Sequence, residues 1–183
     1  PGRIDHHNAM ILGTVGGLLM LTRAFETPRL GWPAGGLVGF ALAVGYEPLA
    51  LIFPMVGIAA LSAVVNTTWL LAVRNFLIAM AATLAVGFVL AVPPIHWPSV
   101  VCDAISINMV LLSGVGAAGI TILHAKGLAW SLSQRIVTLA AIGAAAVSFY
   151  VAADPVCLGG PFALVNADAK RVWLDTVLET QNI

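Results

Sequence analysis

Long uncharged apolar runs, separated by short polar connectors, constrain this chain more than any other feature. They occupy most of residues 9–153, and 60% of all residues are hydrophobic while only 9% are charged. Soluble domains use about 45–50% apolar residues, so the runs predict membrane-spanning helices rather than a soluble core. We therefore predict an all-α fold, a polytopic transmembrane helical bundle.

The apolar runs predict about six crossings. Their expected bounds are 9–22, 33–46, 49–65, 76–92, 107–124 and 136–153. Several are shorter than the ~20 residues that cross ~30 Å of hydrocarbon, and 33–46 is the weakest. Residues 1–153 thus form one transmembrane domain, and residues 154–183 form a polar tail. Small residues at packing distance predict close helix contacts, as in Gly13 with Gly17, Gly35 with Gly39, and Ala140 to Ala146. Because the chain starts on Pro1 without an initiator Met, we expect further N- and C-terminal parts of the same protein.

The basic residues predict the orientation of the bundle. Connectors after the first, third and fifth segments carry Arg23, Arg29, Arg74, Lys126 and Arg135, whereas those after the second and fourth carry none. The positive-inside rule then places the N-terminus and the tail outside the cell. This assignment gathers most acids and histidines on the outer face: Asp5, His6, His7, Glu47, His96, Asp103, Asp154, Asp168, Asp175 and Glu179. The net charge is zero, which gives no field to attract nucleic acid.

Two polar stretches near the expected outer face are candidate sites, and each also has a purely structural explanation. Asp5-His6-His7-Asn8 offers carboxylate and imidazole ligands for a divalent metal. Alternatively, Asp5 is only the N-cap of the first helix. Glu47 lies at the tip of a helical hairpin in Gly45-Tyr46-Glu47-Pro48, and an acid near membrane depth is costly enough to suggest function. Its alternative is a solvated turn residue.

The two remaining outer segments add further candidates. The loop 93–106 contains His96, the interfacial anchor Trp97, and Asp103, which either has a functional role or caps the next helix. Cys102 and Cys157 fall on the same expected face, which allows one disulfide. The tail predicts an amphipathic helix, with an apolar side of Trp173, Leu174, Val177 and Leu178 and a charged side of Arg171, Asp175 and Glu179. That helix either lies on the bilayer surface or returns a carboxylate to the Asp5 region.

Several of these short motifs together resemble a group of bacterial integral membrane proteins. Those proteins are similar to the GT-C membrane glycosyltransferases, especially the oligosaccharyltransferase catalytic subunit. The resemblance rests on Arg3-Ile4-Asp5-His6-His7-Asn8, Gly45-Tyr46-Glu47, Pro93-Pro94 with Trp97, Cys102-Asp103-Ala104-Ile105-Ser106, and Trp173-Leu174-Asp175 with Glu179. It spans most of the chain.

The resemblance implies an enzyme of the bacterial inner (plasma) membrane. It would transfer a sugar from a polyprenyl-phosphate-linked donor at the outer face, assisted by a divalent metal, Mg²⁺ or Mn²⁺. Asp5 matches the first acid of a metal-binding pair and Glu179 matches a later Glu, while His7 stands where the family has the second acid. The expected metal ligands are therefore Asp5, His7 and Glu179. Glu47 and His96 are the expected cofactor-binding residues, and Asp5 or Asp103 is the expected catalytic carboxylate. The Trp-Trp-Asp acceptor motif of that family is absent from this sequence.

Two functions from other classes stay open beside this interpretation. One is a transporter or channel with an outer vestibule of acids and histidines, and the other is a membrane scaffold without chemistry. A transporter should place ionisable or helix-breaking residues near the middle of the membrane, and the apolar runs contain almost none.

Overall fold

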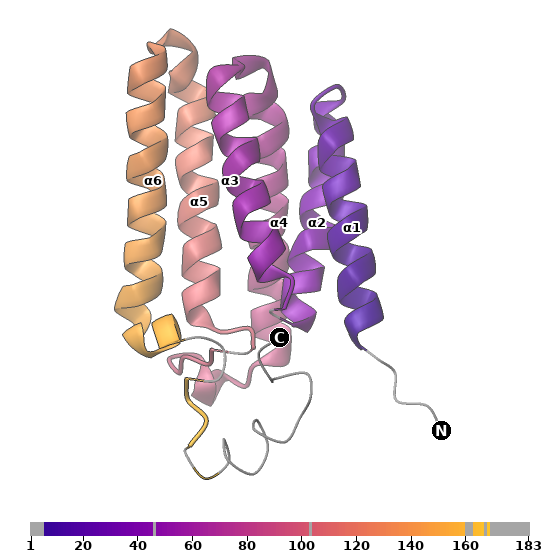
Figure 1. Cartoon of the computed structure of the whole chain (residues 1–183), viewed down its shortest axis with the longest axis vertical. Helices are drawn as coiled ribbons and strands as arrows, with labels where there is room; N and C mark the ends of the chain where they lie inside the picture. The colour runs from indigo at the N-terminus through magenta and orange to yellow at the C-terminus, as the bar shows by residue number, and fades with distance from the viewer. Residues whose placement is uncertain (1–5, 46, 103, 160–162, 167, 169–183) are drawn as a thin grey trace.

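The structure is a computed structural model that describes residues 6–45, 47–102, 104–159, 163–166 and 168 (Figure 1). The long helices are α1 (His6–Ala24), α2 (Gly31–Val44), α3 (Leu49–Val65), α4 (Leu70–Ala91), α5 (Ile107–Lys126) and α6 (Leu132–Ala153). The short 3-10 turns are η1 (Pro28–Leu30), η2 (Thr67–Trp69), η3 (Pro94–His96), η4 (Gly127–Ala129) and η5 (Pro155–Gly159). These residues contain no strand, so the all-α prediction is confirmed for the described part of the chain.

Helices α4 and α6 begin well before the starts that the hydrophobic pattern predicts. The side chain of Asn66 accepts a hydrogen bond from the backbone N–H of Thr68, which starts η2, and η2 runs directly into α4 at Leu70. Ser131 and Gln134 form a reciprocal capping box, so α6 begins at Leu132. The expected starts at residues 76 and 136 were wrong because polar capping residues lengthen both helices beyond their apolar parts.

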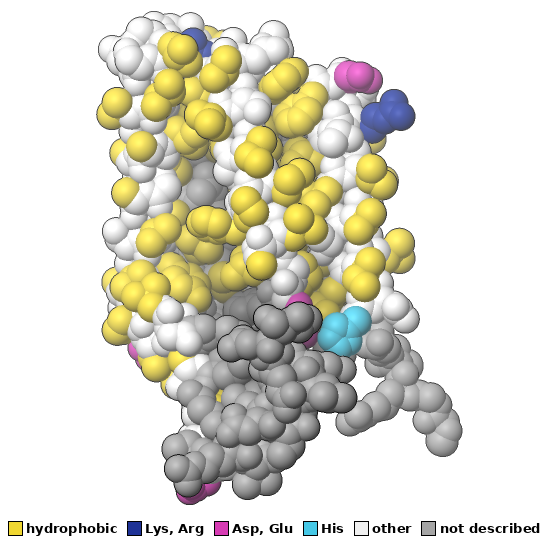
Figure 2. All heavy atoms as spheres, viewed as in Figure 1, with side chains coloured by type: hydrophobic (Ala, Val, Ile, Leu, Met, Phe, Trp, Pro, Cys, Tyr) yellow, Lys and Arg dark blue, Asp and Glu magenta, His cyan; other side chains and the backbone are white. Residues whose placement is uncertain are grey.

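The helices run alternately up and down, and this order gathers the described basic residues at one end of the bundle. Figure 1 shows the ends of α1, α3 and α5 at the same end of the bundle as the starts of α2, α4 and α6. All described Arg and Lys residues belong to this end: Arg23, Arg29, Arg74, Lys126 and Arg135. In Figure 2 the dark blue side chains lie at the top, a histidine lies near the opposite end, and hydrophobic side chains cover the helices between them. We call the opposite end the tip end.

Helix α2 packs between α1 and α4 through two sets of glycines. A Cβ atom on Gly17 would lie 2.9 Å from the carbonyl oxygen of Ala34 in α2, and one on Gly13 would lie 2.9 Å from that of Leu37. On the other side, a Cβ on Gly39 would lie 2.7 Å from the carbonyl oxygen of Met80 in α4. Contacts this close exist only because these residues lack a side chain, which confirms the packing role predicted from their spacing.

Length and composition make the bundle compatible with an integral membrane protein. Within the described residues, three helical segments are long and apolar enough to cross a membrane: Thr67–Ala91, Ile107–Ala129 and Leu132–Ala153. Helix α3 is apolar but shorter, at 17 residues. Helix α2 has 14 residues, which at 1.5 Å per residue makes it about 21 Å long. Six complete crossings therefore remain a prediction.

The alanine-rich part of α6 differs from its predicted packing role. Of Ala140 to Ala146, only Ala146 is buried, because α6 stands at the edge of the bundle. The contact with α5 instead centres on Gly119, where a Cβ would clash with the side chain of Ile142. Arg135 ties the other end of α6 to α3, since its Nη1 donates to the carbonyl oxygen of Val64 at 2.7 Å.

A disulfide joins Cys102, in the loop after α4, to Cys157 in η5, with their Cα atoms 5.2 Å apart. The pairing that the sequence allowed is thus present. Both cysteines are buried, and the bond fixes two loops at the tip end.

We expect the double substitution Cys102→Ser with Cys157→Ser to loosen the tip-end loops without unfolding the bundle. The stability loss should be about 2 kcal/mol, at the low end of the usual range, because α5 and α6 keep the two loops close even without the bond. Thermal unfolding and hydrogen exchange across residues 99–106 and 154–159 measure the effect. Reduced wild-type protein is the control and should behave like the variant. Alkylation of two thiols in unreduced protein would contradict the bond.

Candidate functional site

The described residues bring two of the predicted site residues together at the tip end. His7 lies in the first turn of α1, and Glu47 lies in the connection between α2 and α3. The Nε2 atom of His7 is 3.5 Å from Oε1 of Glu47. The two positions are forty residues apart in the chain, so the packing of α1 against α2 creates this pair.

Beneath the pair, α1 and the end of α2 pack closely against each other. Met10, one turn after His7, is only 2% exposed. A Cβ on Gly45, the C-cap of α2, would lie 2.6 Å from Sδ of Met10 and 3.2 Å from Oε2 of Glu47. Gly45 therefore allows the chain to pass close to α1 and places Glu47 beside His7.

The pair is open to solvent and has little structural value by itself. The side chains of His7 and Glu47 are 51% and 60% exposed. Ion pairs at this exposure are screened by water and contribute little to folding stability. Their exposure places a carboxylate and an imidazole at the solvent-facing surface of the tip end.

The separation of the two side chains fits a shared divalent cation. Metal bonds of about 2.0–2.2 Å to nitrogen and oxygen place two ligands of one ion roughly 3.0–3.5 Å apart. The described residues contain no group of three or more His, Cys, Asp and Glu side chains that could hold a metal. His7 and Glu47 could therefore hold a metal only together with at least one further ligand.

Three of the predicted site residues, Asp5, Asp103 and Glu179, lie outside the described residues. So does the predicted amphipathic helix, apart from its first residue, Asp168. Helix α1 begins at His6, directly after Asp5. The N-cap of α5 is Ser106, and the role of Asp103 stays a prediction.

His96, another predicted site residue, also lies at the tip end but in a separate segment. It belongs to η3 and its side chain is exposed. Within the described residues, no hydrogen bond or ion pair joins it to His7 or Glu47. The same loop is held in place by Trp97, whose Nε1 donates to the carbonyl oxygen of Val92 at 2.9 Å. The ring of Trp97 also packs at 6.1 Å from that of Phe88 in α4.

A buried polar cluster at the start of α5 was not predicted from the sequence. Ser106 and Asn108 are almost fully buried, and their side chains are 2.6 Å apart. The Oδ1 atom of Asn108 also accepts from the backbone N–H of Met109 at 2.9 Å. These bonds link α5 to the loop that carries Cys102, since Ser106 Oγ also lies 2.9 Å from the carbonyl oxygen of Val101. The only sequence signal was the pair of small polar residues at the start of an apolar run.

Comparisons with family models, with curated proteins and with solved structures found no match for this chain.

Proposed function

We propose that this protein is a membrane glycosyltransferase of the GT-C type, which transfers a sugar from a polyprenyl-phosphate-linked donor at the outer membrane face. The observation that carries the proposal is the His7–Glu47 pair, an exposed imidazole and carboxylate 3.5 Å apart at the end of an apolar bundle. The resemblance of the surrounding motifs to GT-C enzymes supplies the reaction class.

Two independent features support an extracytoplasmic location for the tip end. The described Arg and Lys residues belong to the opposite end, as the positive-inside rule requires of a cytoplasmic side. The Cys102–Cys157 disulfide lies at the tip end, which suits an oxidising compartment. Both features favour the orientation in which His7 and Glu47 face the outside.

In this proposal a divalent cation would be held by His7, Glu47, Asp5 and Glu179. When bound, the cation would neutralise the phosphate of the donor, which departs with negative charge. The imidazole of His7 favours Mn²⁺ over Mg²⁺, because nitrogen ligands suit transition metals better than magnesium.

The remaining chemistry requires a carboxylate at the acceptor. The acceptor forms a bond to the anomeric carbon of the sugar while the bond from that carbon to the phosphate oxygen breaks. The acceptor's proton passes to a carboxylate within hydrogen-bond reach, for which Asp5 and Asp103 are the candidates. The lipid phosphate is the other product.

A transporter is a weaker proposal for this bundle. The buried polar residues in the described part of the chain are Thr14, Asn75, Ser106, Asn108 and Ser113, none of which is ionisable. Ion and proton pathways through membranes usually depend on ionisable side chains inside the bundle.

Transfer from a polyprenyl-phosphate sugar in vesicles tests the proposal. We expect a chelator to abolish transfer and Mn²⁺ to restore it. Asp5→Ala should lower the rate by about 100-fold, which corresponds to ~2.7 kcal/mol of lost transition-state stabilisation.

Glu26→Ala is the matched control, because Glu26 is an exposed acid at the opposite end of the bundle. It should leave the rate unchanged. Transfer that resists the chelator and is normal in Asp5→Ala would contradict the proposal.

A further inference from the structure

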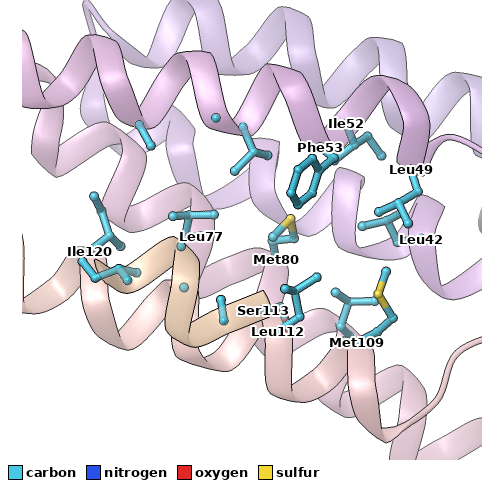
Figure 3. A pocket seen from close by; sticks show the side chains of 18 of the residues that line it. Leu42, Leu49, Ile52, Phe53, Leu77, Met80, Met109, Leu112, Ser113 and Ile120 are labelled. Atoms are coloured by element: carbon cyan, nitrogen blue, oxygen red, sulfur yellow. The ribbon is translucent and has the colours of Figure 1, made fainter. Parts of the chain in front are cut away.

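An apolar cavity of about 220 Å³ lies inside the bundle, between α3, α4, α5 and α6 (Figure 3). Its inner wall is made of deeply buried side chains, among them Met80 and Leu84 of α4 and Met109 and Ile120 of α5. For comparison, an engineered protein cavity of ~150 Å³ is large enough to bind benzene. The cavity therefore has room for part of a hydrocarbon molecule.

The lining excludes water as a stable occupant. Ser113 is the one lining residue with a polar side chain, and its hydroxyl already donates to the carbonyl oxygen of Val110 at 3.1 Å. A water molecule needs two to four polar partners, which this cavity does not offer. Left empty, the lining side chains would lose dispersion contacts on one side.

The cavity opens on the outer surface of the bundle between α3 and α6. Phe53 and Gly57 of α3 and Gly143 of α6 line the cavity and are also exposed. Only 6% of the apolar stretch of α6 is buried inside the bundle, so the rest of the bundle leaves most of this helix uncovered. In a membrane, the surroundings of this opening are the acyl chains of the bilayer.

We infer that the cavity binds an acyl chain of a bilayer phospholipid, which enters between α3 and α6. A whole helix is about 10 Å wide and does not fit a cavity of this volume, whereas a single hydrocarbon chain does. The apolar lining offers no group that would select a rare lipid, so the most concentrated hydrocarbon, the acyl chain, occupies it by mass action. The inference rests on the bundle lying in a membrane and is independent of the transfer reaction.

Three glycines of the cavity lining are positions where a larger residue could occupy the cavity. A Cβ atom on Gly57, Gly116 or Gly143 would have no neighbour within 4 Å, and all three line the cavity. Gly116→Leu therefore adds an apolar side chain to the lining at a position where its Cβ meets no neighbouring atom. Gly114 of the same helix is equally free of neighbours but does not line the cavity, so Gly114→Leu is a matched control.

Photo-crosslinking in vesicles tests the inference. The probe is a phosphatidylcholine with a diazirine in one acyl chain, and mass spectrometry locates the labelled residues. We expect labelling of Met80, Met109 and Ile120, whose side chains are only 8%, 2% and 1% exposed. Gly116→Leu should lower this labelling about tenfold, while Gly114→Leu should stay within about twofold of wild type.

The thermal unfolding midpoint of each variant shows whether it is folded. Three results would overturn the inference: no label on the inner wall, equal labelling in folded Gly116→Leu, or loss of the label when a polyprenyl phosphate is added. The last result would assign the cavity to an isoprenyl chain.

Discussion

Replacing Gly35 by alanine should disrupt the bundle more than the same change at any other described glycine. A Cβ atom at this position would clash with the backbone carbonyl oxygen of Phe76 and lie 2.9 Å from the backbone nitrogen of Met80, both in α4. Backbone atoms inside a helix cannot move aside, so α2 and α4 must separate along their whole contact. We expect a loss of about 3 kcal/mol or more, at the upper end of the overpacking range.

Gly36→Ala gives the matched control for this prediction. Gly36 is the next residue of the same helix, and its Cβ would meet only Oγ1 of Thr83, at 3.9 Å. Alanine there should be neutral or slightly stabilising, because it also favours the helix. Thermal unfolding in detergent compares the two variants. The readout is the amount of monodisperse protein that remains at each temperature. Equal midpoints for Gly35→Ala and Gly36→Ala would mean that α2 and α4 are not in close contact.

The central position of α2 explains why this effect is large. Ala34, Val38 and Ala41 are fully buried, between α1 on one side and α4 on the other. Loss of the α2–α4 contact therefore also moves α1, which carries His7, away from α4. The same glycine that stabilises the fold keeps the tip end assembled.

Spacing rules predicted this packing well because they depend only on local sequence. Glycines four residues apart fall on one face of a helix, so Gly13 with Gly17 and Gly35 with Gly39 marked real contact faces before any tertiary structure was known. The alanines of α6 show the limit of the rule. Their spacing is equally suitable, but whether a neighbour covers that face depends on the whole bundle, and most of them are exposed.

The candidate site could be predicted only as a list of residues. Alternating helix directions placed His7 and Glu47 at the same end, and this followed from the order of the apolar segments. Their contact depends on the register between α1 and α2, which Gly45 and Met10 determine through their packing. The sequence therefore assigned His7 and Glu47 to separate roles, and the structure joins them.

The starts of α4 and α6 were missed for a different reason. Hydrophobic patterns detect the apolar part of a helix, whereas Asn66 and Ser131 begin these helices through hydrogen bonds to the backbone. As a result Arg74 and Arg135 are helical residues rather than connector residues. The error does not alter the end of the bundle at which they lie.

Glu47→Gln and His7→Gln should each lower sugar transfer by about 100-fold, and the double variant should be no slower than either. If both side chains hold one cation, loss of either ligand already weakens the cation's binding and its action on the phosphate, so the two effects should not multiply. Independent roles would instead multiply to a loss of about 10⁴-fold. Both single variants should also need about tenfold more Mn²⁺ for half-maximal transfer, which a purely structural role would not cause.

The matched histidine control is His124→Gln, in the last turn of α5 at the basic end of the bundle. It should leave both the rate and the Mn²⁺ requirement unchanged. Glu47→Asp keeps the charge but shortens the side chain, so it should retain more activity than Glu47→Gln and recover further at high Mn²⁺. A multiplicative loss in the double variant, with an unchanged Mn²⁺ requirement, would show that His7 and Glu47 act separately. The 3.5 Å contact would then be a surface ion pair, and the metal site would have to be assembled without Glu47.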